Sequence, residues 1–167
     1  MTEYIYNQND LPKGLHYGFR ESRATGCGWI AIYNALVHMG CRVNIPVLMR
    51  KLERQVPLVH GNFGTLAFAP YFFFRSQGFQ AEISARVSDF DAIVSRSDCA
   101  LLFYYWRSGR RIGSHFIALH KDVDGITAYN VYSNSKGADR LGGNLSGWIA
   151  ENHHFACVLT GIKQKKR

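Results

Sequence analysis

Cys27 is the first residue to examine for chemistry, because it stands between two glycines directly before an apolar run in the stretch TGCGWIAIYNAL. Apolar residues recur at steps of three and four after it, which predicts a helix from Cys27 to about Met39. Unpaired backbone N–H groups and the helix dipole stabilise a thiolate at a helix N-terminus. Gly26 would let the chain turn sharply and Gly28 would leave the sulfur uncovered. Cys27 is therefore a candidate nucleophile.

A nucleophilic cysteine needs a base, and His115 is the candidate among the seven histidines. His115 opens an apolar strand in GSHFIAL, where a side chain at the rim of a sheet could face a helix end. His38 lies about three turns along the helix of Cys27 and is too far away to contact it. His120 is expected to point to the opposite face of the strand.

An asparagine could hold the imidazole in one tautomer, and two are available in AYNVYSN. The Asp-Gly pair at 124–125 predicts a β-hairpin. If the turn is centred there, Asn130 lies opposite Leu119 and Asn134 lies opposite His115. The pairing therefore favours Asn134, while Asn130 needs a twist or a bulge to reach the histidine.

The order TGCGWIAIYNAL, GSHFIAL and AYNVYSN resembles the papain-like cysteine peptidases. Within them it is most similar to the bacteriocin-processing peptidases, which include the peptidase domains at the front of some bacterial bacteriocin exporters and cut after a double glycine. The resemblance runs from about Arg20 to the last strand. It implies a papain-like fold, with N-terminal helices packed on a mostly antiparallel sheet, and a catalytic triad of Cys27, His115 and Asn130.

The chain departs from that family at the residue that usually holds the oxyanion. A glutamine is expected about six residues before the cysteine, and Glu21 stands there instead. A carboxylate cannot donate a hydrogen bond unless it is protonated. Ser22 or Arg23 is expected to substitute, and Gln8 is a candidate more distant in the sequence.

The remaining pattern predicts helices before a largely antiparallel sheet, which is an α+β order. Thr25 is expected to cap the helix of Cys27, Gly40 to end it, and Ser88 to cap a later helix. Further helices are expected over residues 45–56, 64–78, 88–97 and 139–152, and strands over 79–85, 99–106, 114–133 as a hairpin, and 153–162.

Length and composition predict one domain spanning residues 1–167, with 47% hydrophobic residues and a formal charge of +8. The charge gathers in the tail KQKKR and in RSGRR, which could attract acidic peptides or an anionic surface. No nucleic-acid-binding signature accompanies it. No apolar run is long enough to cross a membrane and no signal peptide is visible, so we expect a cytoplasmic location.

These observations predict a cysteine peptidase acting on a peptide or protein. The alternatives are an inactive papain-like domain that binds peptide, a related acyl-transfer enzyme such as an amidase or transglutaminase, and a basic interaction module. Neither a cofactor nor a metal is expected, because HHFAC is the one His/Cys cluster. Cys41, Cys99 and Cys157 are expected to be ordinary core residues.

Overall fold

A six-stranded antiparallel sheet forms the centre of the computed structural model, which describes residues 3–55 and 64–165. Its strand order is β3-β8-β4-β5-β6-β7. The strands are β3 (Gln80–Ser84), β4 (Cys99–Ser108), β5 (Arg111–Asp122), β6 (Gly125–Tyr129), β7 (Asp139–Arg140) and β8 (Phe155–Lys163). With the helices that cover it, this sheet confirms the predicted α+β class.

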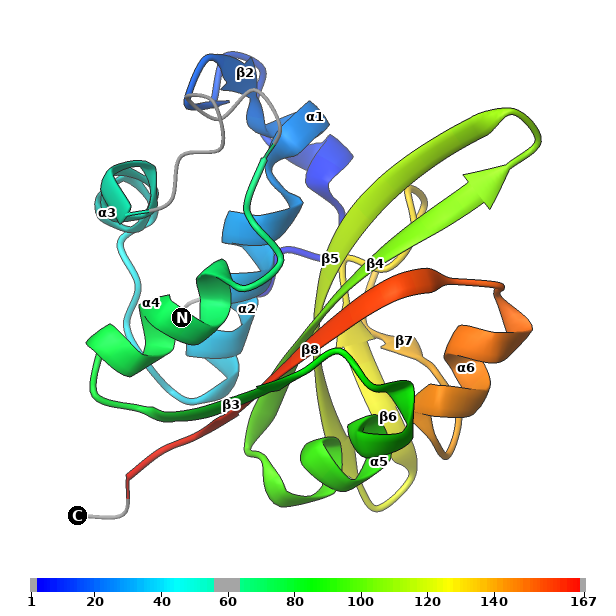
Figure 1. Cartoon of the computed structure of the whole chain (residues 1–167). Helices are drawn as coiled ribbons and strands as arrows, with labels where there is room; N and C mark the ends of the chain where they lie inside the picture. The colour runs from blue at the N-terminus through cyan, green and yellow to red at the C-terminus, as the bar shows by residue number, and fades with distance from the viewer. Residues whose placement is uncertain (1–2, 56–63, 166–167) are drawn as a thin grey trace.

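Helices cover both faces of this sheet (Figure 1). One face carries α2 (Cys27–His38), α3 (Ile45–Gln55) and α4 (Ala69–Ser76). The other carries α5 (Val87–Arg96) and α6 (Leu145–Glu151). Before α2 come the short elements η1 (Gln8–Asp10), β1 (His16–Tyr17), β2 (Arg20–Glu21) and α1 (Ser22–Thr25). The N-terminal helices thus pack on an antiparallel sheet as expected.

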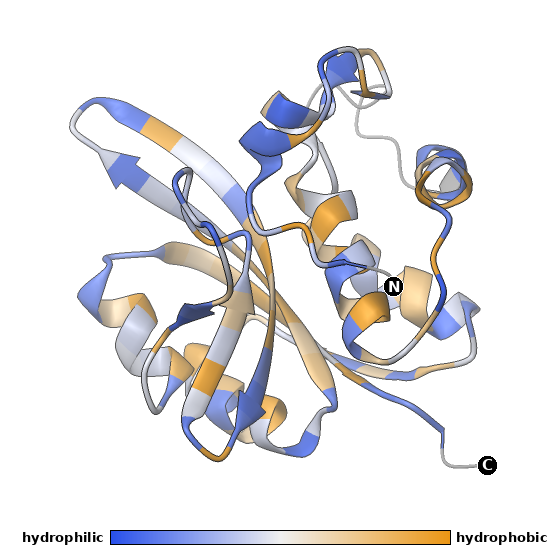
Figure 2. Cartoon of the chain, turned by 180° about the vertical axis from the view of Figure 1, so that it is seen from behind, coloured by the Kyte–Doolittle hydropathy of each residue, from blue (hydrophilic) through white to orange (hydrophobic). Residues whose placement is uncertain are grey.

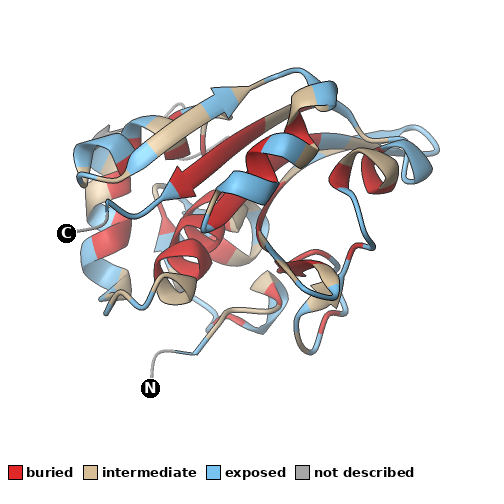
Figure 3. Cartoon of the chain, turned by 90° about the horizontal axis from the view of Figure 1, so that it is seen from below, coloured by how far each residue is buried: buried red, intermediate tan, exposed pale blue. Residues whose placement is uncertain are grey.

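The alternation of side chains along β4 divides the core between the two layers of helices. Leu101 and Phe103 pack on the α2 side, whereas Leu102 and Tyr104 pack on the α5 and α6 side. All four are buried, which explains the apolar run ALLFY over residues 100–104. Figure 3 shows the burial concentrated in α2 and the central strands, and Figure 2 shows the matching hydropathy.

The helix of Cys27 was predicted closely, but its cap was not. Thr25 belongs to the preceding turn α1, and Gly26 occupies the N-cap position of α2 without a side-chain bond. A Cβ at Gly26 would lie 2.8 Å from Nε1 of Trp29 and collide with the Ser22 carbonyl, so only glycine fits this junction. Gly40 ends the helix as predicted, with a φ of 75°.

Three other element boundaries differ from the prediction. Arg86, not Ser88, precedes α5, because the helix begins at Val87. The helix expected over residues 64–78 is α4, which begins only at Ala69, with proline in its first turn. The helix expected over 139–152 is confined to Leu145–Glu151, since Asp139–Arg140 pairs with β6 as a strand. Residue 56, the last one predicted for the helix that corresponds to α3, lies outside the described residues. Most of the region between α3 and α4 lies outside them as well.

The β5–β6 hairpin forms, but the predicted pairing of Leu119 with Asn130 is wrong. Leu119 pairs with Ala128, because the turn is centred one residue earlier and Asp122 pairs with Gly125. The Asp122 carboxylate fixes this turn by accepting hydrogen bonds from the Asp124 backbone N–H and from the Thr127 hydroxyl, both at 2.9 Å.

Within residues 3–55 and 64–165, no helix combines the length and apolar character that a membrane crossing requires.

Lowering the pH from about 7 to about 4 is expected to reduce the free energy of unfolding through His120. Burial, and then the neighbouring His38 ring stacked at 4.0 Å, lower the pKa of His120 from 6.5 to about 4. The unfolded chain therefore binds a proton that the folded protein rejects in this pH range. The measurement is urea unfolding at a series of pH values for the wild type and His120→Gln.

The readout is the slope of stability against pH, which should be shallower in the variant even if lost packing lowers its stability throughout. Asp122 does not interfere, because its hydrogen bonds with Arg140 lower its pKa to about 2. Its contribution begins to be lost only below about pH 5, and it does so in both proteins, so it drops out of the difference between their slopes. Equal slopes in the two proteins would contradict the assignment.

Candidate active site

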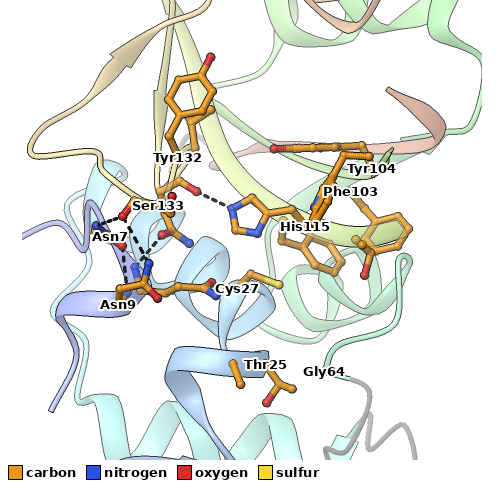
Figure 4. A pocket seen from close by; sticks show the side chains of 18 of the residues that line it. Asn7, Asn9, Thr25, Cys27, Gly64, Phe103, Tyr104, His115, Tyr132 and Ser133 are labelled. Atoms are coloured by element: carbon orange, nitrogen blue, oxygen red, sulfur yellow. Dashed lines mark hydrogen bonds between the residues drawn. The ribbon is translucent and has the colours of Figure 1, made fainter. Parts of the chain in front are cut away.

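Cys27 and His115 line one pocket of about 720 Å³ between the start of α2 and the sheet (Figure 4). The pocket lies where β5 continues beyond the end of β6, since β6 pairs with β5 only from Ala118 onward. Beside the pocket, the backbone of β5 is therefore not covered by another strand among the described residues. The structure brings together two side chains that the sequence places far apart.

Cys27 begins α2 and is partly buried at the pocket wall. Burial raises the pKa of its thiol to about 11, and the backbone N–H groups of Phe116, Gly28 and Cys27 itself offset only part of this effect. The raised pKa favours the protonated thiol at neutral pH. The helix start supplies the expected N–H groups, but burial of the sulfur has the larger effect on its pKa.

Gly28 is needed for packing rather than for exposing the sulfur. It is buried, and a Cβ at this position would collide with the Thr65 side chain. The missing side chain at Gly28 therefore makes room for Thr65. Thr65 also donates a hydrogen bond to the Tyr17 hydroxyl at 3.4 Å, which ties this wall of the pocket to the N-terminal hairpin.

His115 is held in one orientation by a hydrogen bond of 2.6 Å between its Nε2 and the backbone carbonyl of Asn130. A carbonyl only accepts hydrogen bonds, so Nε2 must carry the hydrogen. In the neutral ring the lone pair is then on Nδ1. Burial lowers the pKa of His115, and the Asn130 carbonyl partly offsets this. Figure 4 shows the second ring nitrogen turned toward the side of the pocket where Cys27 lies.

Asn130 thus contacts His115 through its backbone and not through its side chain. Its φ of 61° is the left-handed conformation, which asparagine tolerates better than most residues. Its side-chain Oδ1 accepts a hydrogen bond of 2.8 Å from the Gln8 backbone N–H. The buried Nδ2 has no partner among the described residues. Asn134 also lines the pocket, from the exposed loop after β6.

The two residues expected to hold the oxyanion are engaged elsewhere. Ser22 is fully buried and accepts a hydrogen bond from Nε1 of Trp29 at 3.2 Å. Nε of Arg23 donates to the Leu11 carbonyl at 2.6 Å. Neither residue is among those lining the pocket.

Gln8 is the glutamine that the structure brings to the pocket. Its Nε2 donates to the Arg23 carbonyl at 2.9 Å, which leaves a second N–H on the same nitrogen. Its buried Oε1 has no partner among the described residues. The sequence offered no local signal for this position, because a bond to Asn130 delivers Gln8 from a separate segment of the chain.

A second histidine, His154, shares the pocket and was not predicted. Its ring packs against Tyr104 at 4.1 Å and against Trp148 at 4.7 Å. Burial, and then the nearby His115, lower its pKa to about 4, so it is neutral near pH 7. Burial likewise raises the pKa of Tyr104. Because no Asp, Glu, Lys or Arg is among the described lining residues, the pocket wall is uncharged at neutral pH.

Within the described ranges, no group of three or more His, Cys, Asp or Glu side chains could hold a metal ion. No protein-family model matches the chain, and no curated protein matches it.

Replacing Asn130 with glycine should leave His115 in its present tautomer, because glycine keeps the carbonyl and tolerates the positive φ. Asn130→Ala should be less stable than Asn130→Gly by about 1 kcal/mol, since alanine is strained in this conformation. The measurements are the ring ¹⁵N chemical shifts of His115 and urea unfolding. Loss of the Nε2–H tautomer in Asn130→Gly would instead show that the side chain orients the ring.

Proposed function

We propose that this protein is a papain-like cysteine peptidase in which Cys27 is the nucleophile and His115 is the base. The observation that carries the proposal is the fixed tautomer of His115, whose Nδ1 lone pair is free in the pocket that Cys27 lines. A histidine that only stabilised the sheet would need no free nitrogen in a pocket beside a thiol. The similarity to the bacteriocin-processing peptidases suggests the same class of reaction.

The pKa directions favour a neutral thiol and imidazole at rest, rather than an ion pair. The Cys27 sulfur attacks the substrate carbonyl carbon while its proton passes to Nδ1 of His115. The carbonyl π pair moves to oxygen and forms the tetrahedral oxyanion. When this collapses, the C–N bond breaks and His115 returns the proton to the leaving amine. Water, deprotonated by His115, then hydrolyses the thioester and restores the thiol.

Gln8 is the residue we assign to the oxyanion, together with the backbone N–H of Cys27. The second hydrogen on Gln8 Nε2 is not used by the Arg23 carbonyl, and the side chain lies in the same pocket as the sulfur. In a pocket without charged lining residues, such neutral donors stabilise a developing charge more strongly than they would in water.

A second candidate function is peptide binding without turnover. The raised pKa of Cys27 favours it, because a thiol with a pKa of about 11 is a poor nucleophile unless its proton is removed during the attack. The two functions use the same pocket and differ in whether His115 can take that proton.

A peptidyl vinyl sulfone should label Cys27, and His115→Ala should slow this labelling about 100-fold, as expected for loss of a general base. The rate should rise with pH as His115 loses its proton, at a value below 6.5, and then stay level to about pH 9. Mass spectrometry locates the label, with Cys41→Ala as the matched control that leaves the rate unchanged.

A decline of the rate between about pH 8 and 9 would indicate an imidazolium–thiolate pair and would overturn the neutral mechanism. Labelling of Cys27 no faster than that of Cys41 would overturn the peptidase and leave peptide binding as the function.

Gln8→Ala should lower kcat/KM on a cleaved peptide roughly 100-fold, mainly through kcat, because the lost donor acts on the transition state. Glu21→Gln is the control, since Glu21 is exposed and does not line the pocket. Its kinetics should match those of the wild type. Equal rates for Gln8→Ala and the wild type would exclude Gln8 from the oxyanion site.

A further inference from the structure

The hairpin formed by residues 105–114, which we call the arm, projects beyond the rest of the sheet (Figure 1). On one side, β8 pairs with β4 only as far as Tyr105. On the other side, β6 reaches β5 no further than Ala118. Within the described residues, the arm therefore has two strand edges that no other strand covers.

One free edge of the arm leads directly to Cys27. Asp122 and Gly125 flank a two-residue turn, so their backbones bond to each other, and every second residue of β5 then directs its N–H and C=O toward β6. Continuing this alternation directs the same groups of Ile112, Ser114 and Phe116 to this edge. The Phe116 N–H there already bonds to the Cys27 sulfur, whereas Ile112 and Ser114 face no strand among the described residues. Ser114 and Phe116 line the pocket of Cys27.

The arm is strongly basic. Arg107, Arg110 and Arg111 are exposed, and none of their side chains forms an ion pair or a hydrogen bond with another described residue. No acidic residue occurs in the sequence between Asp98 and Asp122. Figure 2 shows the hydrophilic tip of the arm. The adjoining pocket has an uncharged wall, so selection by charge would occur on the arm rather than beside the sulfur.

We propose that the arm binds an acidic segment of the substrate peptide, which pairs in an extended conformation with the free edge of β5. This rests on the proposed peptidase function and specifies its substrate class. Backbone hydrogen bonds to the edge would place the chain, and the three arginines would select carboxylate side chains flanking the bond to be cut.

Two alternative roles for the basic arm fit the structure less well. Charges on a free strand edge prevent edge-to-edge aggregation, but charges of either sign do so. A nucleic acid would use the arginines but not the unpaired backbone groups that lead into the pocket. An acidic peptide in an extended conformation would use both the arginines and the uncovered backbone groups of β5.

Binding can be measured without catalysis, using the full chain with Cys27→Ala and fluorescent decapeptides containing four Glu, four Gln or four Lys. The Glu peptide should bind at least about tenfold more tightly than the Gln peptide at low salt, and the difference should shrink as salt is added. Methylating alternate backbone nitrogens of the Glu peptide should abolish binding, because strand pairing needs those N–H groups.

The combined variant Arg107→Glu, Arg110→Glu and Arg111→Glu should reverse the preference toward the Lys peptide. Its matched control carries the same charge change at Arg42, Arg86 and Lys163, which are exposed and do not line the pocket, and should keep the wild-type preference. Circular dichroism checks that both variants fold.

Equal affinity for the three peptides, or a preference unchanged by reversing the arm, would overturn the proposal. Tighter binding of an oligothymidylate than of the Glu peptide would overturn it in favour of nucleic acid. Because these measurements use a protein without the nucleophile, they stand whether or not Cys27 proves to be catalytic.

Discussion

The hydrogen bond between His115 and the Asn130 carbonyl joins the two strands of a hairpin at the point where their regular pairing has ended. It is possible because Asn130 takes the left-handed conformation directly after β6, which turns its carbonyl toward the histidine. The same residue uses its side chain to hold Gln8. One amino acid thereby positions the base and the donor we assign to the oxyanion, while α2, packed against the sheet, places Cys27 at its first residue.

Burial has opposite consequences for the two reactive groups. Removing water raises the pKa of Cys27 and lowers that of His115, and both effects favour the neutral pair. An uncharged pocket wall does nothing to reverse this. In the proposed mechanism, the absence of charged lining residues also makes each neutral donor in the pocket more effective toward a developing oxyanion. The weakly acidic thiol and the stabilised intermediate of that mechanism would then share one physical origin.

The sequence was sufficient where local chemistry decides the structure. Helical periodicity predicted α2, and alternation with an Asp-Gly pair predicted the β5–β6 hairpin. It failed where a few side chains shift the register: the bonds of Asp122 move the turn by one residue, so Asn130 does not lie opposite Leu119. Gln8 was named only as a distant candidate after Ser22 and Arg23, because its place in the pocket comes from a contact with Asn130, far away in the chain. The hydrogen bond of the Asn130 carbonyl to His115 could not be predicted either, because the sequence specifies side chains but not the direction of each backbone carbonyl.

The bond between Gln8 and Asn130 spans 122 positions of the chain. Contacts of such long sequence separation tend to form slowly, because the entropy lost on closing the long intervening loop opposes them. The α2 helix and the β4–β5 hairpin can arise from local interactions, but the pocket is complete only when the N-terminal segment closes over the end of β6. A newly made chain that has acquired its sheet would therefore still lack a finished pocket, and Gln8 would reach its place in that pocket only late in folding.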